Sequence, residues 1–285
     1  MANIPVPEWV KTEWLEERRK EIAQRRSKSQ SESTLLKIRR EMAAYSRYFL
    51  QKNQTPKQKF VIFGQGRSGS TLLVQLLNNQ PKIHCEGEIL NGRSYKKVLF
   101  PNLYVQGRCT KFFGKIYGFK VKIYQLTEDQ YIDPEKFILN LSSQGWKIIY
   151  LSRNNYLRSE ISAMLASSKN QWHSSSKSSL KNQKITIDCN RLLKRCERRD
   201  IYRLKEEEIL ENLEHITVVY EEDLLLAKNH QGTSDRIFNY LGLESVSVKT
   251  KLVKITSDRL SDVIENYDEL VEKVSKTKYA KFLID

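Results

Sequence analysis

Apolar positions after residue 59 change repeatedly between two spacings. Short runs rich in β-branched and aromatic residues predict strands; they cover residues 60–64, 116–126, 146–152 and 215–224. The stretches between and after them have the spacing of helices; they cover residues 70–79, 134–145, 154–167, 190–212, a segment near 235 and residues 262–275. Strands that alternate with helices predict an α/β fold with a central parallel sheet flanked by helices.

The first 57 residues have a different pattern. Two helices are expected, at residues 7–27 and 32–52, and we interpret residues 1–57 as a helical extension of a domain spanning 58–285. The second helix carries an apolar stripe that we expect to pack on that domain; its members are Leu35, Leu36, Ile38, Met42, Tyr45, Phe49 and Leu50.

Composition narrows the class of protein. The chain has 285 residues, of which 39% are hydrophobic, and a net charge of +15. No apolar run approaches the roughly 20 residues that span a bilayer, and the first residues lack a signal-peptide core, so we expect a cytoplasmic protein. The charge predicts anionic ligands, yet no nucleic-acid-binding motif accompanies it, so we do not expect a nucleic-acid partner. The four cysteines form no C-x-x-C pair, and no zinc or other metal site is expected.

One loop carries the clearest chemistry. In KFVIFGQGRSGSTLLVQLLNNQP (59–81) a strand, a glycine turn and a helix start follow one another, and residues 64–71 nearly match the phosphate loop G-x-x-x-x-G-K-[ST]. Ser70 stands where that pattern has lysine, and Arg67 lies three residues earlier. Backbone amides at a helix start bind a tetrahedral anion. Without the lysine, a triphosphate would lose a principal counter-charge, so a donor with one phosphate at the loop and a less charged group to transfer fits better.

The segment RSGSTLL (67–73) resembles the 5′-phosphosulfate loop of sulfotransferases that use 3′-phosphoadenosine 5′-phosphosulfate (PAPS). The resemblance implies a P-loop-like sulfotransferase fold. It also implies donor contacts from the loop, namely Gly66, Arg67, Ser68, Gly69, Ser70 and Thr71, with Arg67 assisting transfer of the sulfuryl group.

Two further stretches extend the resemblance. IIYLSRNNYLRSEIS (148–162) is similar to the family's 3′-phosphate motif, which implies that Arg153 binds this phosphate together with Ser162 or, as the alternative, Ser159. ITVVYEEDLL (216–225) resembles a late strand of the family and adds Tyr220 to the donor site.

Transfer to an acceptor hydroxyl requires a base. KIHCEGEIL (82–90) offers Glu88 first, Glu86 second and His84 third, and His173, in a polar segment, is a further alternative. The expected activity is sulfuryl transfer in line and without a metal, from PAPS to a hydroxyl of a sugar, lipid, natural product or carrier-bound substrate. The alternatives are a kinase or NTPase with an altered phosphate loop, and a basic protein that binds anions or nucleic acid.

Overall fold

The computed structural model describes residues 7–28, 34–51, 54–91, 97–168, 184–252 and 259–283. Within them, five strands form one sheet in the order β2-β3-β1-β4-β5, and every pair is parallel. The strands are β1 (Lys59–Gly64), β2 (Ile83–Glu86), β3 (Ile116–Lys122), β4 (Trp146–Ser152) and β5 (His215–Val219). The predicted α/β class with a central parallel sheet is confirmed.

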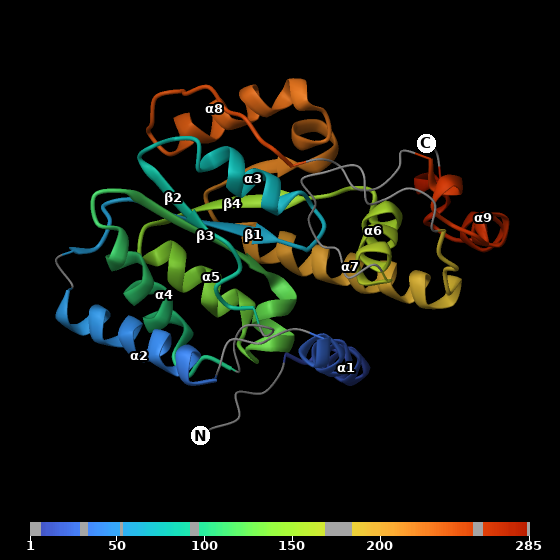
Figure 1. The fold of residues 1–285 in the computed structure, drawn as a ribbon, viewed down its shortest axis with the longest axis horizontal. Coiled ribbons are helices and arrows are strands. Elements are labelled where there is room, and N and C mark those ends of the chain that lie inside the picture. The colour runs from blue at the N-terminus through green and yellow to red at the C-terminus, as the bar shows by residue number, and fades with distance from the viewer. Residues whose placement is uncertain are drawn as a thin grey trace.

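Helices cover both faces of this sheet (Figure 1). On one face, α3 (Ser70–Leu77) and α8 (His230–Tyr240) bury Leu73 and Phe238 against Phe60 and Ile62 of β1. The other face is covered by α4 (Pro101–Cys109), α5 (Pro134–Ser143) and α7 (Cys189–Leu210). Because both faces are covered, the central strand β1 is buried along its whole length.

A smaller apolar cluster lies beside the sheet. It joins α6 (Tyr156–Ser168), the first half of α7, and α9 (Tyr267–Ser275). These helices stand together at one side of the molecule in Figure 1, next to the point where β4 ends. Through this cluster, α6 and α7 are held at fixed positions at the carboxyl end of the sheet.

The two N-terminal helices, α1 (Thr12–Lys28) and α2 (Thr34–Leu50), contribute to the main core. Trp14 of α1 packs against Tyr202 of α7 with ring centroids 5.6 Å apart. Ala44 of α2 is fully buried against α4. In the described part of residues 1–57, the two helices therefore share one apolar core with the sheet domain.

The expected docking of the apolar stripe on α2 is wrong. Six of its seven members expose between 46% and 83% of their surface, and only Tyr45 is buried. The reason lies on the opposite side of the helix, where Ala44 approaches Gly107 so closely that a Cβ at Gly107 would stand 1.8 Å from the Ala44 carbonyl oxygen. Because α2 packs through Ala44 and Tyr45, the other six large apolar side chains of the stripe face outward.

Four elements also differ from the sequence prediction. The strands predicted at 116–126 and 215–224 end early, because their second parts form π-helical turns at Gln125–Asp129 and Tyr220–Leu224. Residues 83–86 form an edge strand, and α4 is a helix that the apolar pattern did not predict. Both turns begin just past the carboxyl end of a strand and place polar residues there.

The contact between α2 and α4 yields a stability prediction. Gly107→Ala should lower the free energy of unfolding by about 2 kcal/mol or more, because the new Cβ forces the two backbones apart. Gly232→Ala in α8 is the matched control, since a Cβ there meets nothing within 4 Å. Urea denaturation of the two variants measures the difference, and equal stability would contradict the packing of α2.

Candidate active site

The glycine loop is positioned by the register of three strands. Gly64, the last residue of β1, lies opposite Lys122 of β3 and Leu151 of β4. It has a φ of 152°, and a Cβ there would stand 2.2 Å from the Leu151 carbonyl oxygen. The loop then turns into α3 through Gly69, whose φ is 84°. Arg67 is also left-handed, with φ 61°, a conformation that costs energy outside glycine and is typical of functional loops.

Three successive loop carbonyls accept hydrogen bonds from side chains. The Arg153 Nη1 donates to the carbonyl of Arg67 at 2.7 Å, and the Arg199 Nη2 donates to that of Gly66 at 2.8 Å. The Ser68 hydroxyl donates to the Gln65 carbonyl at 2.7 Å. Because the N–H of a peptide points opposite to its C=O, the amides that follow these carbonyls are turned toward the other side of the loop. Such a set of amides forms a nest for an anion.

The arginine of the loop meets the serine of α6. The Arg67 Nη2 and Nε donate to the Ser162 Oγ at 2.6 and 3.2 Å. Burial, and next the charge of Arg199, lower the pKa of Arg67. Thus two side chains predicted from separate motifs lie side by side, in surroundings that an anion would stabilise.

Arg153 lies at the end of β4, next to Arg67. Its guanidinium stacks on Tyr220 at 4.3 Å from the ring centroid and lies 3.6 Å from the Glu221 carboxylate. Burial lowers the pKa of Arg153 to about 10. Tyr220 also borders Gly69, where a Cβ would stand 2.8 Å from the ring. Arg153 and Tyr220 therefore form one wall of the site.

Two buried polar atoms, one on Arg153 and one on α6, have no hydrogen-bond partner among the described residues. They are the Nε of Arg153, which lies 3.6 Å from the Glu221 carboxylate, and the Oγ of Ser159, a buried residue of α6. Orphaned buried donors carry a free-energy cost of roughly 1–3 kcal/mol. A ligand that accepts hydrogen bonds would relieve that cost.

The cation missing from the loop motif is supplied by β3. The Lys120 Nζ lies 3.0 Å from the Thr71 Oγ1 and 3.3 Å from the Ser70 Oγ, and it also lies 3.3 Å from the Glu88 carboxylate. Lys122 pairs with the same carboxylate at 2.7 Å. Sequence reasoning missed both lysines, although charged residues at alternate positions of the buried run FKVK were a usable signal.

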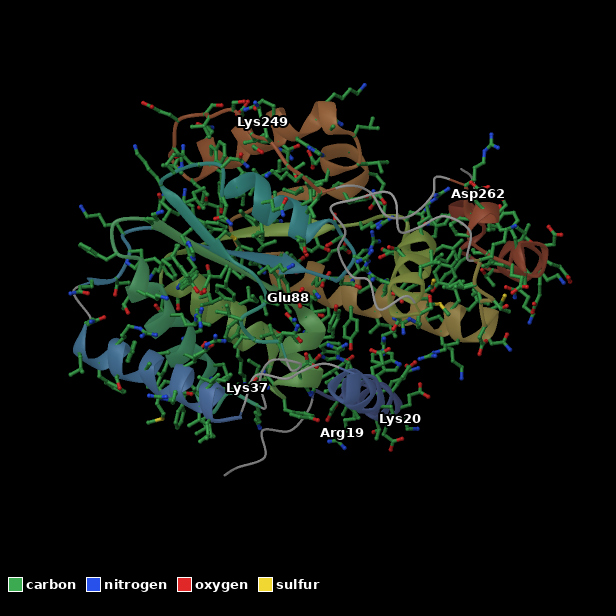
Figure 2. All side chains as sticks on the ribbon, viewed as in Figure 1. Arg19, Lys20, Lys37, Glu88, Lys249 and Asp262 are labelled. Atoms are coloured by element: carbon green, nitrogen blue, oxygen red, sulfur yellow. The ribbon has the colours of Figure 1, made fainter. Side chains whose placement is uncertain are left out.

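Glu88 is held tightly as an anion. Gln125 and Asn91 donate to its second carboxylate oxygen at 2.8 and 3.1 Å. Burial alone would raise the pKa of Glu88, but Lys122 and Lys120 outweigh it and lower the pKa to about 2. Figure 2 places Glu88 in the middle of the molecule, close to the sheet. It is the one candidate base whose carboxylate contacts a lysine that reaches the loop.

The other candidate bases have different surroundings. Glu86 accepts hydrogen bonds from the Arg108 Nε at 3.0 Å and the Tyr117 hydroxyl at 2.5 Å. His84 stacks on Phe112 with centroids 3.7 Å apart, and burial lowers its pKa. His173 lies outside the described residues.

A cavity of about 600 Å³ opens between α2, α4 and the segment that follows β2. Its lining consists of Leu36, Arg39, Arg40, Ala43, Arg47, Glu86, Gly87, Glu88, Ile89, Arg108 and Lys111. Glu88 is one of the residues that line this cavity, and its carboxylate contacts Lys120 and Lys122. The volume is typical of a pocket for a small ligand.

A buried acid lies beneath the loop. The Gln65 Nε2 donates to the Glu206 Oε2 at 3.3 Å, and the Tyr150 hydroxyl donates to the same oxygen at 3.3 Å. Burial raises the pKa of Glu206 to about 8. Glu206 is therefore neutral at pH 7 and supports the loop through Gln65.

Two searches of the described part of the chain are negative. None of its helices is long and apolar enough to cross a membrane. Nor do His, Cys, Asp or Glu side chains in these ranges gather in threes to hold a metal ion.

Comparison with known proteins gives a structural likeness and no sequence relative. No family model matches the chain, and no curated protein matches it. Among solved structures, a sulfotransferase from Alicyclobacillus acidocaldarius is similar, with a TM-score of 0.47 and 14% identity over 80% of this chain and 95% of that chain.

Glu206 provides a test of the support beneath the loop. Its folded pKa lies above its ordinary value of 4.5, so the proton stays bound in the folded state and leaves the unfolded one. Between pH 4.5 and 8 this group therefore lowers the stability of the fold, with a slope approaching about 1.4 kcal/mol per pH unit, as pH rises. Glu206→Gln should remove that slope, and Glu207→Gln, an exposed neighbour on α7, should not. Unfolding free energies from pH 5 to 9 measure both, and parallel curves for Glu206→Gln and wild type would contradict a neutral Glu206.

Proposed function

We propose that the protein transfers a sulfuryl group from PAPS to an acceptor hydroxyl. The observation that carries the proposal is Lys120, which touches the two hydroxyls of the loop on one side and Glu88 on the other. A phosphosulfate on the loop and a hydroxyl at Glu88 would meet at this lysine.

The loop fits the 5′ end of such a donor. The turned amides, the hydroxyls of Ser70 and Thr71, and the charges of Arg67 and Lys120 would surround one phosphate and its bridging oxygen. Negative charge builds on that oxygen as the sulfuryl group leaves, and fixed cations stabilise it. These side chains supply the counter-charge, so the step would need no metal.

The α6 side of the site fits a second phosphate. Arg153 precedes α6 and bonds the carbonyl of Arg67, whose guanidinium bonds Ser162 in the second turn of α6. Ser159, whose hydroxyl is orphaned, lies three residues before Ser162 on the same helix. An anion is already accommodated at this helix start, because Glu221 accepts hydrogen bonds from the amides of Asn154 and Asn155 at 3.0 Å each. We assign the 3′-phosphate to Arg153 with Ser162, and Ser159 is the further donor.

Glu88 is our proposed base. The acceptor oxygen would form its bond to sulfur while its proton passes to the Glu88 carboxylate, and the bond from sulfur to the phosphate oxygen would break with its electron pair left on adenosine 3′,5′-bisphosphate. A carboxylate with a pKa of about 2 is a weak base. A donor phosphosulfate would draw the charge of Lys120 toward itself, which would raise the pKa of Glu88 when the donor is bound.

Donor binding tests the first half of the proposal. Adenosine 3′,5′-bisphosphate in EDTA should bind with micromolar affinity or better, and Arg153→Ala should weaken it tenfold or more, because a charged hydrogen-bond partner is lost. Arg203→Ala, which removes a half-exposed arginine of α7, is the control and should bind normally. Isothermal titration calorimetry measures all three proteins. Binding of ATP with magnesium instead of the bisphosphate would refute the proposal and indicate a kinase-like protein.

The base is tested by separating binding from turnover. Glu88→Gln should bind the bisphosphate at least as tightly as wild type, because Lys120 and Lys122 lose their competing carboxylate. Turnover of PAPS with an acceptor should fall by a factor of about 100 or more. Glu86→Gln is the matched control, since Glu86 lies on the same stretch and is held by Arg108. If Glu86→Gln loses the turnover and Glu88→Gln keeps it, the two roles are exchanged.

A further inference from the structure

The hydroxyl of Tyr124 lies directly against the phosphate loop. A Cβ at Gly66 would stand 2.4 Å from this hydroxyl oxygen and 3.5 Å from the Nζ of Lys122. Gly66 does not adopt a left-handed conformation, so the hydroxyl, and not the backbone, excludes a side chain at this position. The missing side chain of Gly66 therefore makes room for the Tyr124 hydroxyl beside the loop.

Two cations hold the ring of Tyr124 in this place. The Cζ of Arg18, on α1, lies 5.0 Å from the ring centroid, and the Nζ of Lys122 lies 5.6 Å from it, which are cation–π contacts. Arg18 is fixed in turn by the carboxylate of Asp129, to which it donates hydrogen bonds at 3.0 and 3.1 Å. These contacts are made with the ring, so they leave the hydrogen-bonding capacity of the hydroxyl to a ligand.

The hydroxyl also lies between the two halves of the proposed site. Gly66, on one side of it, belongs to the loop that would hold the donor phosphate. Lys122, on the other side, pairs with the Glu88 carboxylate at 2.7 Å. A sulfuryl group that passes from the loop to an acceptor at Glu88 would therefore pass beside Tyr124.

We propose that Tyr124 is a further catalytic residue, whose hydroxyl donates a hydrogen bond to a non-bridging oxygen of the sulfuryl group during transfer. This inference rests on the proposed function, and it names a residue that acts on the transferred group instead of the donor phosphates. A donor held in place before the reaction stabilises charge on the transferred group without reorganisation. Tyr124 keeps its proton throughout, and the proton of the acceptor still passes to Glu88.

The first test removes a single oxygen atom. Tyr124→Phe keeps the ring and its contacts, and it should bind adenosine 3′,5′-bisphosphate as wild type does, because this product has no sulfuryl group. Cleavage of PAPS with water as the acceptor, measured as release of the bisphosphate and sulfate, should slow by a factor of about 100. Tyr131→Phe is the matched control, since it removes a hydroxyl that accepts a hydrogen bond from Arg19 at 3.1 Å, and it should change neither quantity.

A second pair of variants separates a chemical role from a packing role. Gly66→Ala brings a methyl group to 2.4 Å from the Tyr124 hydroxyl and should weaken bisphosphate binding by displacing the loop. When Tyr124→Phe is added, the nearest remaining atoms belong to Lys122 and stand at 3.5 Å, so the methyl group fits. The double variant should therefore regain affinity for the bisphosphate, while its cleavage of PAPS stays as slow as that of Tyr124→Phe.

The outcomes distinguish this inference from the function on which it rests. Slow cleavage with normal bisphosphate binding in Tyr124→Phe, together with regained binding but not cleavage in the double variant, supports the inference. Wild-type cleavage by Tyr124→Phe, or recovery of cleavage in the double variant, overturns it and leaves the proposed function standing, because the tyrosine would then only fill space beside Gly66. Failure of the wild-type protein to bind the bisphosphate overturns the proposed function itself.

Discussion

The site depends on two arginines, the buried Arg199 and the largely buried Arg153, that donate hydrogen bonds to the backbone of the phosphate loop. Arg153 and Arg199 donate to the carbonyls of Arg67 and Gly66, at 2.7 and 2.8 Å. These bonds fix the direction of the loop's peptide planes, including the left-handed conformation of Arg67. A glycine loop without such anchors could take many conformations. The entropy lost when a ligand orders the loop would then weaken binding. The loop is therefore preorganised by Arg153, which directly follows β4, and by Arg199 of α7.

Placing these arginines beneath the loop creates a chain of charges through the molecule. Arg199 is paired with Glu160 of α6, and Arg195 links Glu160 to Glu21 of α1 at 2.5 and 3.0 Å. Burial alone would raise the pKa of Glu160, but Arg195 and Arg199 lower it to about 2. Buried ion pairs gain little net stability, because desolvation offsets their attraction. Their contribution here is to fix positions, because the same ion pairs connect α1, α6 and α7 to the loop.

Part of this architecture was readable from sequence. The strand, glycine turn and helix around residues 59–77 follow from local periodicity and from backbone needs that only glycine meets. The positions of Arg153 and Ser162 near Arg67 follow from parallel topology, because carboxyl ends of adjacent strands share one edge. The role of Arg199 could not be predicted, because a charged residue in the sequence CERRD looks the same whether its helix is solvated or buried.

The packing of the apolar stripe on α2 was predicted wrongly for a related reason. Periodicity shows that a helix has an apolar face, but the close contact of Ala44 and Gly107, which decides the packing, is made by two small residues with no pattern of their own.

Sequence and structure together explain which cation serves the loop in place of the missing lysine. In a P-loop the lysine is part of the motif, so Ser70 at that position predicts a loop with less positive charge. In the folded chain, however, the register of β3 against β1 puts Lys122 level with Gly64 and Lys120 level with Ile62. From that position the Lys120 side chain reaches the loop hydroxyls. The cation at the loop hydroxyls therefore comes from a neighbouring strand and not from the loop, and it also contacts Glu88. A lysine within the loop could only stabilise the donor. In the proposed reaction, a lysine held between the loop and a carboxylate would also couple the charge state of that carboxylate to the presence of the donor. One side chain would then link the donor side of the site to the acceptor side.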